Sequence, residues 1–339
     1  MSPMRRASAY VLAPDTASDY ALTIGLNVEP GSARLLAGGV SSTVVMLEGE
    51  PPVVLKQALP KLRVASEWHA DPGRSETEAE ALRLLHSITP EHVPTLLAAD
   101  PEAHILALRC APAHWRDWRS ILLAGPGEAD IARGRTAGLV LGRWHAATWD
   151  SPAVRASFAR PDAFDDLRLD PFHREIVRRR AAPAELVEPL IDELASARQC
   201  IVHGDYSPKN VLVGDSGLWV IDAEVAHVGA AVFDLAFLVA HLALKAVHAP
   251  AHAALLRLTT TAFLFGYEEA NAGRVEPDSV ARHAAAIMLA RVSGKSPASY
   301  LDETQAVRAA HIARRVLESP MGGLDGLWES AGLAEGAHS

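Results

Sequence analysis

Hydrophobic and polar positions follow two different periods along the chain. In the first part, apolar runs rich in β-branched residues recur at 41–47, 52–57 and 104–110, separated by glycine and proline. Such runs predict the strands of a small antiparallel sheet. Residues 74–88 instead carry apolar residues at helical spacing behind an acidic first turn, which predicts one helix packed on that sheet.

After about residue 110 the pattern becomes mostly helical. Periodic segments rich in alanine and leucine predict helices at 128–149, 184–198, 231–247, 251–272, 277–292 and 302–317. Residues 200–222 interrupt them with three short apolar runs split by polar loops, a pattern typical of small strands that present loop residues. We therefore expect an α+β protein with two domains, residues 1–110 and 111–339.

Composition narrows the classes of function. The chain has 339 residues and a net charge of −9, which opposes the basic surface that nucleic-acid binding needs. Its two cysteines, Cys110 and Cys200, are too few for a disulfide framework and suit a reducing compartment. The most apolar stretch, 230–247, is interrupted by polar residues. We expect a cytoplasmic protein with neither nucleic-acid nor membrane partners.

The sharpest chemical signal is the segment 203–210, His-Gly-Asp-Tyr-Ser-Pro-Lys-Asn. Phosphoryl transfer needs a carboxylate on the acceptor hydroxyl and oxygen ligands for Mg²⁺. Asp205 fits the first role, while Asn210 and the later Asp222 fit the second. The same order occurs in protein-kinase catalytic loops, with Gly204 here in place of arginine. The alternative is an Asx-rich turn between two strands.

A kinase also needs a cation on the nucleotide phosphates. Lys56 ends the apolar run 52–55, as such a lysine should. Its usual partner is a helix carboxylate, and Glu76, Glu78 and Glu80 open the next helix. We choose Glu78 as the partner, and a solvated acidic first turn is the alternative.

Backbone groups in two further segments are candidates for nucleotide contacts. Small residues between two predicted strands would let backbone amides approach phosphates, and they are Gly38, Gly39, Ser41 and Ser42. A plain hairpin turn explains this segment nearly as well. At the end of the third predicted strand, the backbone of Leu108 and Cys110 would face the nucleotide base.

Three other features remain open. Residues 293–296, Ser-Gly-Lys-Ser, end like a phosphate-binding loop but follow a helix, which indicates a helix-ending turn. Asp234 could cap a helix or brace the catalytic loop, and we interpret it as structural. The acidic side chains in 162–170 would suit a cationic acceptor, whereas four acids in a surface loop are more often only solvated; they are Asp162, Asp165, Asp166 and Asp170.

At these residues the chain resembles the aminoglycoside phosphotransferase and choline kinase superfamily, over roughly residues 31–317. Segments 54–60, 78–82, 170–172 and 221–224 look like its methylthioribose kinase branch. The resemblance implies a bilobal protein-kinase-like fold with ATP and Mg²⁺ as cofactors. It further implies the following roles and assembly: Asp205 as catalytic base, Asp222 and Glu224 as Mg²⁺ ligands, Lys56 on the ATP phosphates, and a homodimer such as related kinases form.

The acceptor is less sharply indicated than the reaction. The catalytic loop ends in Asn210 where that branch has serine, and Ala290-Arg291 is the nearest match to its late arginine pair. We expect transfer of the γ-phosphoryl group of ATP to a hydroxyl of a small molecule, with a methylthioribose-like sugar first. An aminoglycoside or other amino-alcohol stays open, as does a catalytically silent ligand-binding protein. A protein kinase is disfavoured because a helix begins near residue 230.

Overall fold

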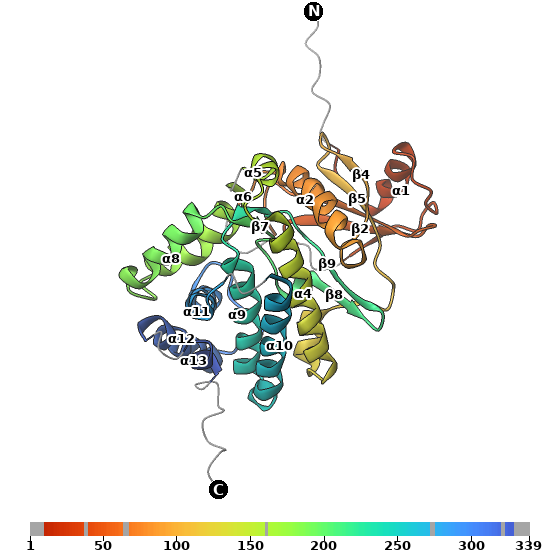
Figure 1. Ribbon diagram of the computed structural model, residues 1–339. Helices are drawn as coiled ribbons and strands as arrows, with labels where there is room; N and C mark the ends of the chain where they lie inside the picture. Colours follow the sequence, from red (N-terminus) through yellow and green to blue (C-terminus); the bar gives the residue numbers. More distant parts are fainter. Residues whose placement is uncertain are drawn as a thin grey trace, which may run out of the picture. The chain divides into compact units, whose positions relative to one another are not determined.

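The computed structural model describes residues 10–36, 40–63, 68–159, 162–271, 275–319 and 323–328 (Figure 1). The chain forms two compact units. The first contains residues 1–83 and 94–112, and the second contains residues 84–93 and 113–339. The boundary within helix α2 (Arg74–Ile88) assigns its last turn to the second unit.

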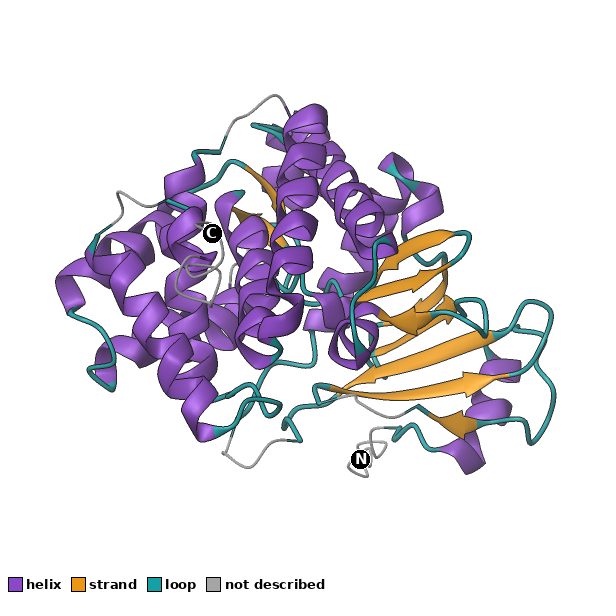
Figure 2. Ribbon diagram, turned by 90° about the horizontal axis from the view of Figure 1, so that it is seen from below, coloured by secondary structure: helices purple, strands orange, loops and turns teal. Residues whose placement is uncertain are grey.

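The first unit is built on a five-stranded antiparallel sheet with the order β1-β2-β3-β5-β4 (Figure 2). Its elements are α1 (Pro14–Thr23), β1 (Arg34–Leu35), β2 (Ser42–Leu47), β3 (Val53–Ala58), most of α2, β4 (Leu96–Asp100) and β5 (Ile105–Arg109). The three runs at 41–47, 52–57 and 104–110 therefore form β2, β3 and β5, as predicted. The α2 helix spans the predicted residues 74–88.

Alternation along β3 sends successive side chains to opposite faces of this sheet. Val53 and Leu55 belong to an apolar core with α1, to which Ala17 and Ala21 contribute. Lys56 points to the other face, where it forms an ion pair with α2. One face of β3 is thus structural, and the other carries the lysine.

The second unit is mainly helical. Its helices are α3 (Trp118–Ala124), α4 (Ala129–Thr148), α5 (Pro152–Ser157), α6 (Asp162–Phe164), the π-helix η2 (Asp165–Arg174), α7 (Glu175–Arg178), α8 (Ala184–Ser196), α9 (Val232–His248), α10 (Ala253–Asn271), α11 (Pro277–Ser293), α12 (Glu303–Glu318) and α13 (Asp325–Trp328), with short 3₁₀ turns η1 (Pro90–His92), η3 (Pro208–Asn210) and η4 (Pro250–His252). Each of the six predicted helices is present within two residues of its expected ends.

Two small sheets lie among these helices. β7 (Cys200–Val202) pairs with β10 (His227–Gly229), and β8 (Val211–Gly214) pairs with both β6 (Arg116–Asp117) and β9 (Gly217–Val220). All these pairs are antiparallel. The short strands predicted within 200–222 are therefore confirmed as β7, β8 and β9, and the loop 203–210 connects the two sheets.

Helices α4 and α10 run side by side with α9 in this unit and approach each other closely (Figure 1). Gly138 of α4 makes this approach possible, because a Cβ at this position would overlap the carbonyl oxygen of Phe263 in α10. Two backbones cannot come so close across a side chain. The packing of α4 on α10 therefore requires glycine at this position.

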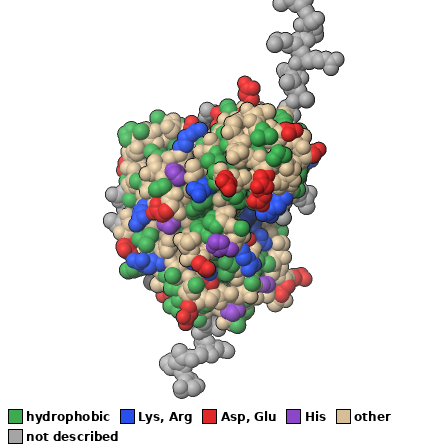
Figure 3. All heavy atoms as spheres, turned by 90° about the vertical axis from the view of Figure 1, so that its right-hand side faces the viewer, with side chains coloured by type: hydrophobic (Ala, Val, Ile, Leu, Met, Phe, Trp, Pro, Cys, Tyr) green, Lys and Arg blue, Asp and Glu red, His purple; other side chains and the backbone are tan. Residues whose placement is uncertain are grey.

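Within the described residues, no helix is both long enough and apolar enough to pass through a membrane. On the face shown in Figure 3, acidic and basic side chains are interspersed with hydrophobic ones. Charge of a single sign does not dominate this face.

Candidate functional site

The loop that follows β7 is held by a buried carboxylate of α9. Asp234 lies in the first turn of α9, where its Oδ2 accepts the His203 N–H at 2.7 Å and its Oδ1 accepts the Gly204 N–H at 2.9 Å. His145 Nε2 lies 3.4 Å from Oδ2. Burial acts to raise the pKa of Asp234, but His145 and the backbone donors outweigh it and lower that pKa. An ionised Asp234 therefore fixes the backbone just before Asp205.

Gly204 is required by the shape of this loop. Its φ is +76°, in the left-handed region that favours glycine. A Cβ would also lie 2.8 Å from the carbonyl oxygen of Val225. Residues other than glycine are therefore disfavoured before Asp205, both by the backbone conformation and by the lack of space for a Cβ.

Asp205 is positioned by an arginine from the π-helix η2. Arg168 Nη2 lies 2.7 Å from Asp205 Oδ2, and Arg168 Nε donates to the carbonyl oxygen of Gly204 at 2.8 Å. The guanidinium also packs 6.0 Å from the Phe172 ring and 5.7 Å from the Phe237 ring. π-Helices are rare and frequently mark functional sites. Here the π-helix delivers a cation to the candidate catalytic carboxylate.

Three oxygen-bearing side chains follow Asp205 in the same unit. The Asn210 amide nitrogen donates to the carbonyl oxygen of Asp205 at 3.1 Å, and its backbone carbonyl accepts the Ile221 N–H at 2.9 Å. Carboxylate oxygens of Asp222 and Glu224 lie within 4.8 Å of each other. Hard cations such as Mg²⁺ prefer carboxylate and amide oxygens. This donor set therefore fits a divalent cation.

Asp222 has an unusual backbone. Its φ is +70°, which is uncommon for a residue other than glycine. Such conformations cost about 1–3 kcal/mol and cluster at active sites and ligand clamps. This conformation fixes the direction of the Asp222 side chain at the expense of backbone strain, as is common at ligand-binding sites.

His203 shapes the loop from inside. It is buried, stacks against Trp144 with 6.4 Å between ring centroids, and its Nδ1 accepts the Asp205 N–H at 3.2 Å. Burial lowers the pKa of His203. The ring is thus neutral near pH 7, and its contacts are those of a support for Asp205 and not of a proton carrier.

In the first unit, the expected pair of Lys56 and Glu78 is present. Lys56 Nζ lies 2.6 Å from Glu78 Oε2 and 2.7 Å from Oε1, and both residues are buried. Of the three glutamates that open α2, Glu78 is therefore the one that fixes the lysine ammonium.

The small-residue segment before β2 is only partly described, and Gly38 and Gly39 lie outside the described residues. The carbonyl oxygen of Ser41 accepts a 2.6 Å hydrogen bond from Arg74 Nη2. Ser42 begins β2 and is buried. Their contact with nucleotide phosphates stays a prediction.

The end of β5 is fixed by its neighbour β3. Leu108 pairs with Val54 in the sheet, and the Cys110 N–H donates to the carbonyl oxygen of Pro52 at 2.9 Å. That donor is therefore already used inside the first unit. A contact of Leu108 and Cys110 with a nucleotide base stays a prediction.

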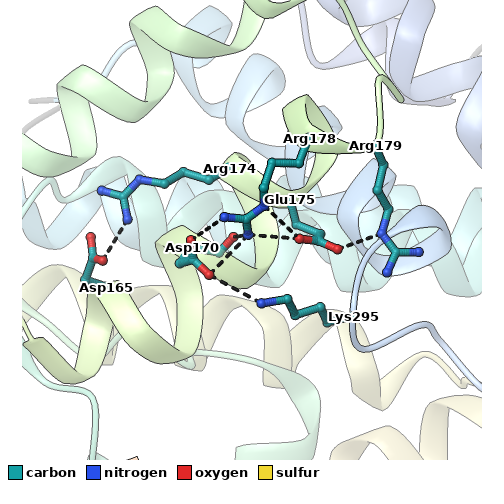
Figure 4. A network of polar contacts seen from close by, with 7 residues as sticks. All are labelled: Asp165, Asp170, Arg174, Glu175, Arg178, Arg179 and Lys295. Atoms are coloured by element: carbon teal, nitrogen blue, oxygen red, sulfur yellow. Dashed lines mark hydrogen bonds and ion pairs between the residues drawn. The ribbon is translucent and has the colours of Figure 1, made fainter. Parts of the chain in front are cut away.

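Two of the four acids in the segment 162–170, Asp165 and Asp170, are paired with basic side chains (Figure 4). Asp165 pairs with Arg174 at 2.7 Å, and Asp170 pairs with Arg178 at 2.7 Å and with Lys295 at 3.4 Å. The hydrogen bond from Arg178 is the main cause that lowers the pKa of Asp170. Two of the four acids are thus neutralised within the protein, which weakens this segment as a site for a polycation.

Two contributors to the site carry little or no signal in the sequence. Of the two roles considered for Asp234, capping a helix or bracing the catalytic loop, its hydrogen bonds with the backbone of His203 and Gly204 are those of a brace. Arg168 belongs to no recognisable motif. It lies in a polar segment 37 residues before Asp205, and the π-helix η2 brings its side chain to Asp205.

Comparisons with known proteins identify the family of the chain. The family model of the phosphotransferase enzyme family (APH) matches residues 32–272. A methylthioribose kinase of Pectobacterium atrosepticum is 27% identical over 261 residues, which cover 68% of this chain and 65% of that relative. The chain thus spans slightly less than two thirds of this relative.

Solved structures support the same fold. A choline/ethanolamine kinase family protein of Mesorhizobium loti superposes with a TM-score of 0.51 at 16% identity, covering 89% of this chain and 92% of that one. An amicoumacin kinase in complex with AMP-PNP and Ca²⁺ gives a TM-score of 0.51 at 15% identity, covering 91% and 94%. The α+β architecture is therefore that of the kinase-like phosphotransferases.

Proposed function

Because the chain belongs to the phosphotransferase enzyme family, we propose that it transfers the γ-phosphoryl group of ATP to a hydroxyl of a small molecule. The observation that carries this proposal is the braced loop, in which Asp234 fixes the backbone before Asp205 and Asn210 contacts the backbone after it. Phosphoryl transfer depends mainly on positioning and on neutralising charge. A rigid carboxylate beside oxygen ligands suits that task.

Asp205 is the candidate base. Its carboxylate would accept the proton of the acceptor hydroxyl as the oxygen attacks the γ-phosphorus. Arg168 and the loop hydrogen bonds hold the carboxylate in one orientation. The residues around Asp205 would therefore orient its carboxylate, and the carboxylate would accept the proton.

Asn210, Asp222 and Glu224 would hold Mg²⁺, and when bound this ion neutralises charge on the phosphates. Lys56, fixed by Glu78, would contact the nucleotide phosphates. ATP and a divalent metal are supported by the amicoumacin kinase, which was solved with AMP-PNP and Ca²⁺. Small residues at 38–42 and the backbone at 108–110 are the further candidates for nucleotide contacts.

For the acceptor, a sugar with ribose-like hydroxyls has the best support, because the matched relative is a methylthioribose kinase. An aminoglycoside is less well supported, because Asp165 and Asp170 already pair with Arg174 and Arg178. A homodimer, which the resemblance to related kinases implies, and a cytoplasmic location, which the two cysteines suit, stay predictions.

The test is coupled ADP release with Mg²⁺ and ATP over a panel of alcohols. The panel contains methylthioribose, pentoses and their phosphates, hydroxy acids, choline-like alcohols and aminoglycosides. We expect turnover with at least one sugar, and a loss of about 10³-fold or more in Asp205→Asn, because the base and its orientation are removed together. ADP release that persists in Asp205→Asn would refute the assigned base.

A catalytically silent sensor is distinguished by the same panel. It would bind ATP with Mg²⁺ and release no ADP with any alcohol. We expect the active outcome, because aspartate, asparagine and lysine occupy the positions that the reaction needs.

A further inference from the structure

Five basic side chains of the second unit act on one another through their charges, and one of them, Arg168, pairs with Asp205. We call them the basic cluster, and they are Arg119, Arg168, His241, Lys245 and Arg291. They come from α3, η2, α9 and α11, which are far apart in the sequence. Mutual repulsion among these groups lowers the pKa of His241, after the larger effect of its burial. The cluster is therefore compact enough for its charges to interact.

Lys245 is the most unusual member. The residue is only 1% exposed, and its Nζ donates to the carbonyl oxygen of His241 at 3.2 Å and lies 5.5 Å from the Tyr300 ring centroid. Arg119 lies 5.9 Å from the same ring. Two cations thus share one aromatic ring, an arrangement that is unfavourable unless an anion joins them.

Arg291 lies beside them, held by the turn that follows α11. Its Nη1 donates to Ser296 Oγ at 2.8 Å, so the Ser-Gly-Lys-Ser segment places an arginine instead of binding a phosphate itself. Within the described part of the chain, Arg291 Nε and the Tyr300 hydroxyl are buried and have no hydrogen-bond partner. Buried donors are normally satisfied, so these two indicate an absent acceptor.

Acidic groups near the cluster do not balance it. Asp205 is paired with Arg168, and Asp117 caps α3 by accepting the Ser120 N–H at 2.9 Å. Among the described residues, Lys245, Arg119 and Arg291 form no ion pair with a carboxylate. Burial, followed by repulsion from Arg119 and Arg291, lowers the pKa of Lys245 to about 7. The cluster therefore lacks carboxylate partners for these three side chains, and Lys245 loses part of its charge near pH 7.

We propose that the basic cluster binds an oxyanion, a carboxylate or a phosphoryl group, carried by the acceptor alcohol whose hydroxyl Asp205 would deprotonate. That the anion is part of a phosphoryl acceptor rests on the proposed function. The existence of an anion site rests only on the basic cluster. It refines the sugar acceptor to one that carries an anionic group, and neutral methylthioribose becomes the comparison compound.

The first arm of the test measures binding without nucleotide or metal. Calorimetric titration compares ribose 5-phosphate with ribose, and glycerate with glycerol, which separates phosphoryl from carboxylate recognition. We expect at least one anionic compound to bind about tenfold or more tightly than its neutral partner, since charge-assisted hydrogen bonds strengthen binding. Equal binding within both pairs would overturn the proposal.

Variants then assign the preference to the cluster. Lys245→Met and Arg119→Gln should each reduce it to about threefold or less, and two variants guard against misfolding of either one. Arg135→Gln is the matched control, because Arg135 is exposed and pairs with Glu269 at 2.6 Å on the α4–α10 surface. Lys56→Met tests the nucleotide-phosphate site as an alternative source. A preference lost in Lys56→Met but kept in Lys245→Met would overturn the proposal.

The second arm separates this inference from the proposed function. ADP release with the anionic acceptor, weakened in Lys245→Met but not in Arg135→Gln, supports both. Anion-selective binding with no ADP release from any acceptor refutes the kinase and keeps the anion site. ADP release with neutral sugars that is unchanged in Lys245→Met keeps the kinase and overturns the anionic acceptor.

Discussion

Replacing Asp234 by asparagine removes the charge that fixes the catalytic loop while preserving its shape. In the wild type, one buried carboxylate accepts two backbone N–H groups, from His203 at 2.7 Å and from Gly204 at 2.9 Å. An asparagine retains one acceptor oxygen. Its amide NH₂ must then face one of the two backbone donors, with His145 close by. One of the two loop hydrogen bonds is therefore lost.

The expected magnitude follows from these contacts. A hydrogen bond to a charged group contributes about 1.5–3 kcal/mol, and a buried donor left unpaired carries a penalty of similar size. We expect Asp234→Asn to lower the free energy of unfolding by about 2–4 kcal/mol. Displacement of Asp205 by about 1 Å should also reduce kcat by about 100-fold in the fraction that remains folded.

Urea denaturation measures the first effect and steady-state ADP release at low temperature measures the second. Asp130→Asn serves as the control, because Asp130 is also buried and accepts one backbone N–H, from Gly127 at 2.8 Å, but does not touch the catalytic loop. It should lose stability with kcat nearly unchanged. Equal kcat in folded Asp234→Asn and in the wild type would refute the bracing role.

Lys56→Met should raise the KM for ATP and lower kcat/KM by about tenfold or more, since Glu78 then remains buried without its cation. Kinetics at varied ATP concentration measure this, and an unchanged KM for ATP would contradict it. Lys245 has a pKa of about 7 in the folded protein against an ordinary value of 10.5, so it destabilises the folded state fully below pH 7 and not at all above pH 10.5. Between pH 7 and about pH 9, the free energy of unfolding of the wild type should therefore rise by roughly 2–3 kcal/mol relative to that of Lys245→Met. Denaturation across this pH range measures the rise, and parallel pH curves for the two proteins would contradict it. Gly138→Ala should lower the free energy of unfolding by about 2 kcal/mol or more, because the new Cβ overlaps the carbonyl oxygen of Phe263. Gly127→Ala is the control, because no atom lies within 4 Å of its Cβ position. Thermal unfolding compares the two variants, and equal melting temperatures would show that α4 and α10 can separate without loss of stability.

Local periodicity explains which parts of the fold the sequence predicts. β2, β3 and β5 are short apolar runs bounded by glycine and proline, α2 has helical spacing, and the predicted ranges agree with the structure. Helix α1 is not predicted because its buried residues are small: Ala17, Ser18 and Ala21. The π-helix η2 is not predicted because the segment is polar, contains Pro171 and follows no common period.

The candidate site divides in the same way. Asp205, Asn210 and Asp222 are close in sequence, so a short segment reveals them together. Members of the basic cluster such as Arg119 and Arg291 are separated by more than a hundred residues and are collected only by tertiary packing. Their partners are aromatic rings and backbone groups, which leave no spacing to recognise.

The proposed reaction moves a phosphoryl group from ATP to a hydroxyl under the control of Asp205. Phosphorus NMR of a reaction with Mg²⁺, ATP and the best acceptor of the panel tests it directly. We expect a phosphomonoester signal that grows as the γ-phosphate signal falls, and that is absent with Asp205→Asn. Growth of inorganic phosphate alone, or an ester signal that persists in Asp205→Asn, would contradict it.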